Sequence, residues 1–534
     1  MVRASNLSGD FSSGAFKYNR LLSLSLYVIL LANLSLPGIT FSQNPFERPN
    51  SSINRLSGGN IGMNFKWSGS LFSGLGTHAD AMGGSISTLY PGADAIYSNP
   101  AGLGFASGFS INLDWSPPLS INPGGVIGIE GRINDGLLSA VEQNPPIDPQ
   151  TGEFLPAKGA VEDANFRSEL AMNGGLKGGV VMYGNRFFSV AGAFHQPLRF
   201  ESQINLSGTE FLAAALDDNG DITHRMFGTI NGNLNLNLNV EASTIGIGTE
   251  LLPGLSLGLV YDNFNGEMNF SGTVLPEGII SSSGDTKSFN DPRAIQYDSL
   301  FATIRGDWEG NGQRIRSAIG FHPRHNLSLD LVFTTPLRID MRGPFSMVHN
   351  TIRALNLNAE GDEEVLDVDI LVEDNLTKTK KIVTRVPGMD LQAPGSLALG
   401  FSTNWQNYFA SFTYTTYFDK LGYRFSFEEV DSLGQNIKSG EVRQGIDLGN
   451  SFRIGIGVEQ LILGLGVLFA ETFEKTTTIK PSQNGPKIST KGSRFFLPFF
   501  SLGGGVDVSS SFRLDYVFNF FKSSFLRFST TYKL

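Results

Sequence analysis

Residues 327–342 read LSLDLVFTTPLRIDMR, and apolar side chains occupy almost every second position. A period of two sustained over about fifteen residues is typical of a long β-strand with one apolar and one polar face. The same alternation recurs in residues 234–241 (LNLNLNVE) and 512–519 (FRLDYVFN). Beyond residue 105 the chain is therefore predicted to consist of alternating strands, which makes the fold class all-β.

The composition agrees with strands and excludes several classes of protein. The 534 residues include 63 glycines and 42 phenylalanines, and 17% of them are charged. A net charge of −10 lacks the basic surface of a nucleic-acid binder. The absence of cysteine removes disulfides, thiolate catalysis and zinc–thiolate sites. With only six histidines and no nucleophile–base pattern, we expect no metal, no cofactor and no enzymatic activity.

Strand length and inward charges favour a membrane barrel over a soluble sandwich. Many segments reach the roughly 9–11 residues that a tilted transmembrane strand requires. One face of these strands carries arginines, which suits a lumen better than a protein core. The arginines assigned to this inward face are Arg314, Arg316, Arg338, Arg342, Arg453, Arg513 and Arg527.

The connections between strands alternate in length. Short turns are expected near residues 184–186, 252–254, 322–324, 404–407, 459–460 and 503–511. Long connections are expected at residues 121–169, 205–231, 275–311, 343–383, 418–446 and 474–491, with a short one at 521–524. These thirteen connections give fourteen strands. An even strand number with turns on one side and loops on the other is typical of bacterial outer-membrane barrels. We therefore predict an antiparallel transmembrane barrel over residues 106–534.

The N-terminus carries an export signal. Residues 21–38 (LLSLSLYVILLANLSLPG) contain no charge, and Arg3, Lys17 and Arg20 precede them. Small residues at positions 40 and 42 precede Gln43. This order predicts a cleaved signal peptide over residues 1–42 and localisation in the bacterial outer membrane. The alternative is an uncleaved anchor, because the apolar run is barely long enough to span a bilayer.

Residues 43–105 do not alternate, and we predict that they form a plug, or hatch, inside the barrel. Their most telling part is residues 76–105, GTHADAMGGSISTLYPGADAIYSNPAGLGF, which is rich in small side chains. This segment resembles the hatch of long-chain fatty acid transport outer-membrane proteins, the FadL-type or TodX-like family. The matching hatch residues are Gly83, Gly84, Asp94, Asn99, Pro100 and Ala101. Residues 391–401 and 319–336 resemble strand segments of the same family.

The resemblance implies passive uptake of hydrophobic molecules such as long-chain fatty acids or hydrocarbons. In that family outer loops capture the ligand, and it leaves sideways through a gap beside a kinked third strand. Here the third strand is residues 187–203, where Gly192 permits a bend and Pro197 cannot donate to the ladder. An ordinary bulge is the alternative explanation. Implied partners are the ligand, outer-membrane lipid, lipopolysaccharide and the barrel-assembly machinery, and we expect a monomer.

Two candidate sites have alternative explanations. Arg314, Arg316, Arg338 and Arg342 are predicted to converge in the upper lumen, where they would bind a ligand carboxylate or form a structural charge network. The Asn99-Pro100-Ala101 stretch is either a hinge of the hatch or a rigid turn into the first strand.

Other features of the sequence are less specific. The alternation slips near Ile245 and Ile247, which indicates either a bulge or an apolar patch in the lumen. Residues 217–221 (DDNGD) resemble part of a calcium loop, but Gly228 stands where the closing glutamate belongs. The rival function is a type IX secretion shuttle, whose barrel has the same hatch motif and whose long loops bind cargo proteins. An enzyme would have to rely on His195, His322 or His325.

Overall fold

The computed structural model describes most of the chain beyond residue 50. The described residues are 51–57, 60–69, 76–121, 165–172, 174–216, 222–282, 285–289, 302–349, 382–430, 433–479, 485–520 and 526–533. The predicted signal peptide lies outside them. Among the described residues, no helix is long and apolar enough to cross a membrane.

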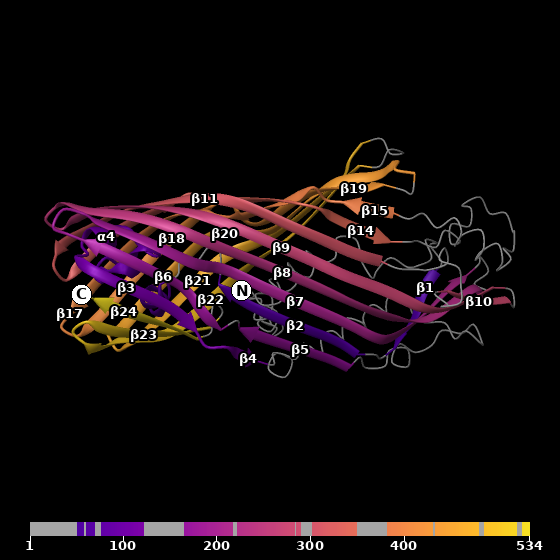
Figure 1. Ribbon diagram of the computed structural model, residues 1–534, viewed down its shortest axis with the longest axis horizontal. Coiled ribbons are helices and arrows are strands. Elements are labelled where there is room, and N and C mark those ends of the chain that lie inside the picture. The colour runs from indigo at the N-terminus through magenta and orange to yellow at the C-terminus, as the bar shows by residue number, and fades with distance from the viewer. Residues whose placement is uncertain are drawn as a thin grey trace, which may run out of the picture.

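The fold is a closed antiparallel barrel of fourteen strands, as predicted (Figure 1). Closure comes from β24 pairing with β3, where Phe528 lies opposite Trp115. Eleven wall strands are β3 (Gly108–Ser116), β6 (Gly175–Gly184), β7 (Ser189–Leu216), β8 (Ile222–Leu252), β9 (Leu255–Ser282), β11 (Ala302–Arg324), β20 (Asn436–Val458), β21 (Leu461–Ile479), β22 (Lys487–Ser509), β23 (Phe512–Phe520) and β24 (Leu526–Lys533).

Three further wall strands are interrupted. They are the series β12 (Leu327–Thr334), β13 (Leu337–Arg342) and β14 (Phe345–His349); β15 (Ile382–Arg385), β16 (Gly388–Ala393) and β17 (Gly395–Trp405); and β18 (Tyr408–Phe418) and β19 (Lys420–Val430). Additional strands extend or join the wall: β1 (Ser51–Ser57), β2 (Asn60–Gly69), β4 (Leu119–Ile121), β5 (Asn165–Met172) and β10 (Asp285–Phe289).

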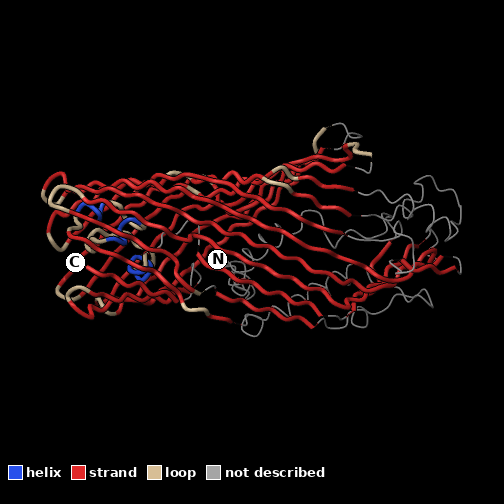
Figure 2. The backbone as a smooth tube through the Cα atoms, in the orientation of Figure 1, coloured by secondary structure: helices blue, strands red, loops and turns tan. Residues whose placement is uncertain are grey.

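Short helices occupy the lumen near the end of the barrel that carries the short turns and the C-terminus (Figure 2). They are α3 (Thr77–Ala81), η1 (Ala93–Ile96) and α4 (Ala101–Gly104). Helix α3 packs against β22 and β23, and α4 packs against β8 and β9. Residues 76–105 therefore lie inside the barrel, whereas residues 60–69, also expected in the plug, form wall strand β2.

The strands are much longer than a membrane requires. Strand β8 has 31 residues, and β7 and β9 have 28 each. Residues 205–231 and 418–446, which we expected to be mostly connections, are largely strand instead. The wall continues beyond the membrane because its inner face there is apolar and must stay covered.

The apolar face of the wall changes side part-way along the strands. On β9, Leu259 and Tyr261 point outward and are 47% and 40% exposed, whereas Phe264 and Met268 point inward and are fully buried. Asn265 and Glu267 then occupy the outward face. An outward apolar belt is the surface that meets lipid. It includes Leu113, Val181, Phe194, Ile245, Leu259, Tyr261, Ile315, Ile319, Leu329, Phe333, Leu399, Phe401, Phe412, Ile454, Leu465, Phe469 and Phe496.

A bulge makes this change in the stretch that first indicated the fold. Arg316 pairs with Thr334, but Asn311 pairs with Asp340, so one extra residue is inserted between β12 and β13. Leu329 therefore faces outward and Ile339 faces inward, although the sequence repeats without a break. The sequence prediction of one continuous face was wrong for this reason.

On strand β8 the apolar face also changes side, but β8 itself contains no bulge at that point. Its pairing with β9 runs without a register shift from Glu241 to Ile247. Ile245 and Ile247 face outward in the belt, and the leucines of residues 234–238 face inward. The slip is therefore neither a bulge in β8 nor an apolar patch in the lumen. The strand crosses the outer boundary of the belt at this point, so its apolar residues change from the inner to the outer face.

Candidate functional site

The Gly83-Gly84 pair forms the turn by which the plug docks on the wall. Both residues have positive φ, 70° and 79°, which glycine adopts at little cost. The Gly83 amide donates to Ser501 Oγ at 3.1 Å, and the Gly84 carbonyl accepts from Arg453 Nη1 at 2.8 Å. The pair is thus held against the inner face of β20 and β22.

Asn99 is held by one aspartate of the wall. Its Nδ2 donates to Asp330 Oδ1 at 2.9 Å, and Thr88 Oγ1 donates to the same oxygen at 2.7 Å. The Asn99 side-chain oxygen also accepts from the Ala101 amide at 3.2 Å, which fixes the turn before α4. These contacts favour a rigid turn anchored to β12, with the two plug segments joined through Asp330.

The Pro100-Ala101 end of the turn rests directly on backbone of the wall. Ser256 Oγ donates to the Ala101 carbonyl at 2.6 Å. A Cβ atom at Gly258 would lie 2.0 Å from the Pro100 carbonyl oxygen, so only glycine fits there. Glycine in this wall strand therefore lets the plug approach the sheet closely.

We predict that Gly258→Ala destabilises the protein by displacing the plug. The added methyl group must push away backbone atoms, and overpacking of this kind costs about 1–3 kcal/mol. The folded barrel, followed by heat-dependent migration on a gel, should unfold at a lower temperature. Gly192→Ala is the matched control, because a Cβ there would meet nothing within 4 Å. Equal unfolding temperatures for the two variants would contradict the docking role of Gly258.

A buried ion pair ties α3 to the last strand. Arg527 on β24 is fully buried, and its Nη1 donates to Asp80 Oδ2 at 2.8 Å. Its Nη2 also lies 3.3 Å from Asp114 Oδ1, which accepts from Thr77 Oγ1 at 2.8 Å. Asp94 of η1 lies near this cluster. Burial and the charge of Asp114 raise the pKa of Asp94 well above its usual range, so its protonated form is favoured more than in an exposed aspartate.

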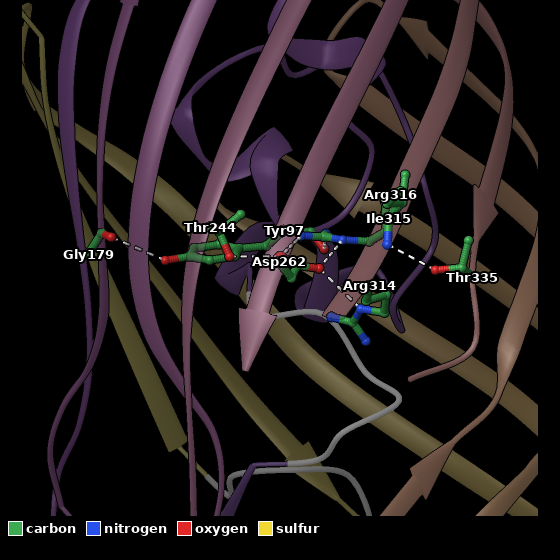
Figure 3. A network of polar contacts seen from close by, with 8 residues as sticks. All are labelled: Tyr97, Gly179, Thr244, Asp262, Arg314, Ile315, Arg316 and Thr335. Atoms are coloured by element: carbon green, nitrogen blue, oxygen red, sulfur yellow. Dashed lines mark hydrogen bonds and ion pairs between the residues drawn. The ribbon is translucent and has the colours of Figure 1, made fainter. Parts of the chain in front are cut away.

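Arg314 and Arg316 face the lumen, but both guanidinium groups already pair with a carboxylate of the protein itself (Figure 3). Asp262 on β9 accepts from Arg314 Nε at 3.1 Å, and from Arg316 Nε and Nη2 at 3.0 and 2.8 Å. Thr244 Oγ1 donates to the same carboxylate at 2.7 Å. Arg316 Nη1 also donates to the Tyr97 carbonyl at 2.6 Å, which links the wall to the plug.

Arg338 and Arg342 lie on the opposite face of the wall. The bulge before β13 turns them outward, where their side chains are 58% and 59% exposed. Arg338 pairs with Asp390 at 2.6 Å, and Arg342 pairs with Asp340 at 2.7 Å. The four arginines are therefore not brought together, contrary to our expectation.

A gap separates the second and third wall strands and is filled by β2. Direct pairing of β6 with β7 ends at Gly178 and His195. Beyond it, β7 pairs with β2 from Leu198 onward, and β2 pairs with β5 on its other side. Pro197 lies at the bulge where this change occurs, because the β7–β8 register shifts between His195 and Leu198. Gly192 lies in regular pairing below the bulge, so the bend is not at Gly192.

Above the belt, the inner face of the wall is a continuous apolar cluster. It runs from β7 through β21 and is covered outside by polar side chains such as Asn265 and Glu267. Its members include Phe200, Leu236, Leu238, Phe264, Met268, Phe270, Trp308, Ile339, Met341, Phe345, Val386, Met389, Tyr423 and Phe425. The molecule thus has a polar lumen that contains the plug at one end and an apolar interior at the other.

Several solved structures match this chain at low sequence identity. The Pseudomonas putida toluene transporter TodX matches with a TM-score of 0.43 and 16% identity over 86% of this chain and 97% of that chain. A Pseudomonas aeruginosa FadL homologue matches with 0.41 and 12% over 87% and 100%. The Ralstonia pickettii toluene transporter TbuX matches with 0.40 and 12% over 87% and 99%. The chain resembles FadL and TodX. No family model and no curated protein matches the sequence.

The barrel wall contains two residues that hold the plug and its neighbouring arginines and that the sequence did not reveal, Asp262 and Asp330. Each is a lone carboxylate on the inward face of a strand, opposite the plug. A lone carboxylate at an inward position was the feature of the sequence that could have indicated these two contacts. The partners Arg316 and Asn99 are 54 and 231 residues away, so no local pattern reveals them.

Other predictions concern parts of the chain that the structure does not describe. The calcium-like residues 217–221 lie outside the described residues. A secretion shuttle would bind cargo at the loops 121–169 and 343–383, of which residues 122–164 and 350–381 also lie outside the described residues. Within the described part of the chain, no group of three or more His, Cys, Asp or Glu side chains is arranged to hold a metal ion. Of the three histidines named for an enzyme, His195 is buried against Tyr97, and Thr88 contacts His322.

Proposed function

We propose that the protein is an outer-membrane channel for passive uptake of hydrophobic molecules, such as long-chain fatty acids or hydrocarbons. The observation that carries this proposal is the apolar interior above the belt. An apolar lining beneath a polar exterior offers a hydrophobic solute a route through the lipopolysaccharide layer. That layer otherwise excludes hydrophobic solutes. Apolar pockets with few polar groups are the usual binding sites of such molecules.

The plug argues against straight passage into the periplasm. Asp330, Arg316 and Arg527 each bond to it from a different part of the wall. We therefore expect the plug to block a continuous path for water and ions, and a hydrophobic solute to leave sideways into the membrane.

The gap filled by β2 is the exit that we propose. Its lower end is flanked by the outward apolar side chains Leu176 and Phe194, which are 61% and 50% exposed. On β7 the outward residue beyond the bulge is Arg199, so the gap begins at the outer boundary of the belt. A solute released there enters lipid directly once β2 moves aside.

Uptake of labelled oleate and labelled hexadecane by cells lacking the gene tests this function. We expect at least one of them to enter roughly tenfold more slowly in the deletion strain, with wild-type rates after complementation. Uptake of a small sugar serves as the control and should not change. Equal uptake of both hydrophobic compounds in deletion and wild-type cells would refute the proposal.

A further inference from the structure

The wall of the upper barrel contains a window. Pairing of β13 with β16 ends at Arg342 and Gly388, and pairing of β14 with β15 resumes at Ser346 and Arg385. The residues between include Pro344 and Pro387, neither of which has an amide hydrogen to donate. The ladder cannot close here, and a cavity of about 1010 Å³ lies at the interruption.

The window lies well above the membrane. Phe270 of β9 lines the cavity and is nine residues beyond Tyr261, an outward apolar residue of the belt. At about 3.3 Å per residue this places the window roughly 30 Å along the strand from the belt. Its outer rim is polar, so it opens toward water or lipopolysaccharide sugars and not toward lipid tails.

The inner side of the cavity is part of the apolar interior. Phe270, Phe345 and Val386 line the cavity and also belong to the buried cluster above the belt. Trp308 packs against both phenylalanines, with ring centroids 5.3 Å apart in each case. The cavity therefore connects the polar exterior to the apolar lining through the side of the barrel.

The charges around the window balance. Arg305 and Arg385 are matched by Asp307 and Glu428 among the lining residues. A ligand carboxylate would have to compete with these two acids for the two guanidinium groups, so the rim offers it no net attraction. A cavity of this size with aromatic walls suits a neutral molecule of up to drug size.

We propose that this window is a side entrance through which neutral hydrophobic molecules reach the apolar interior. The proposal rests on the proposed channel function and names its point of capture and its ligand class. It requires no movement of the plug, so capture can be measured apart from transport.

Fluorescence of Trp308 provides the test. The full-length protein, with the other three tryptophans, Trp67, Trp115 and Trp405, replaced by phenylalanine, is placed in lipid nanodiscs. It is titrated with 1-bromooctane or 8-bromooctanoic acid, because a bromine atom quenches tryptophan only at close range. We expect 1-bromooctane to quench Trp308, and the acid to require at least tenfold higher concentration at pH 7.

Variants decide whether the molecule enters by the window. Ser426→Phe and Ser346→Phe place rings at the cavity and should each weaken quenching about tenfold. Asn265→Phe adds the same ring to the outer face of β9 away from the cavity and should leave quenching unchanged. Quenching that survives both filling variants, or equal quenching by the acid, would overturn the proposal.

The side entrance and the channel function can fail independently of each other in these experiments. Quenching that responds to Ser426→Phe, together with normal hydrophobic uptake in the deletion strain, would support the site and refute the channel. Reduced uptake in the deletion strain without window-dependent quenching would support the channel and refute the side entrance.

Discussion

Arg527→Met is expected to release the plug and open an ion path through the barrel. The substitution leaves Asp80 and Asp114 as buried carboxylates without their cation, and breaking a buried pair from one side costs about 3–5 kcal/mol. The plug segment around α3 can relieve this penalty by leaving the wall, because Asp80 of α3 and Asp114 of wall strand β3 then reach water. We expect single-channel current in planar bilayers to rise from near zero to a steady value.

Arg513→Met is the matched control for this prediction. Arg513 points inward on the neighbouring strand, but its partners Glu459, Asp507 and Asp515 all belong to the wall and its turns. Its loss should lower the unfolding temperature without producing current. Adding Asp80→Asn to Arg527→Met should restore part of the seal. If Arg527→Met lowers the unfolding temperature but gives no channel current, the prediction is wrong and other contacts suffice to hold the plug.

A disulfide between β2 and β7 is expected to abolish uptake of hydrophobic molecules. Asn64 and Gln203 are paired neighbours, both exposed on the outer face, and the chain has no native cysteine to interfere. In the variant with both residues changed to cysteine, oxidation should fix β2 in the gap. Because the proposed exit requires β2 to leave, we expect hexadecane uptake to fall at least tenfold and to return after reduction.

The control disulfide uses the same position on β7. Gln203 also pairs with Asn235 on β8, so Gln203→Cys with Asn235→Cys joins two strands that the exit does not separate. Its oxidation should leave uptake unchanged. If the Asn64–Gln203 disulfide forms quantitatively and uptake continues at the wild-type rate, the exit does not pass between β2 and β7.

Much of the architecture was accessible from sequence because it depends on local rules. Alternation over residues 512–519 and short turns such as 252–254 are set by neighbours in the chain, and they sufficed to count fourteen strands. The plug segment was recognisable because its small residues, such as Gly83 and Ala101, break the strand pattern. Arg316, Arg453 and Arg527 were correctly assigned to the inner face, since no bulge separates them from the membrane belt.

The sequence by itself thus determined the barrel, its strand number, the plug and the inward position of the lower arginines. Only the tertiary structure decided which face of each strand is inside above the belt. A single inserted residue before β13 exchanges lumen and exterior, and it moved Arg338 and Arg342 out of the predicted site. Tertiary structure likewise decided that Asp262 neutralises Arg314 and Arg316, and that β2 fills the gap beside Pro197. The physical reason is that pairing register and long-range charge contacts are properties of the closed sheet. Period-two alternation looks the same whichever side of the sheet it faces.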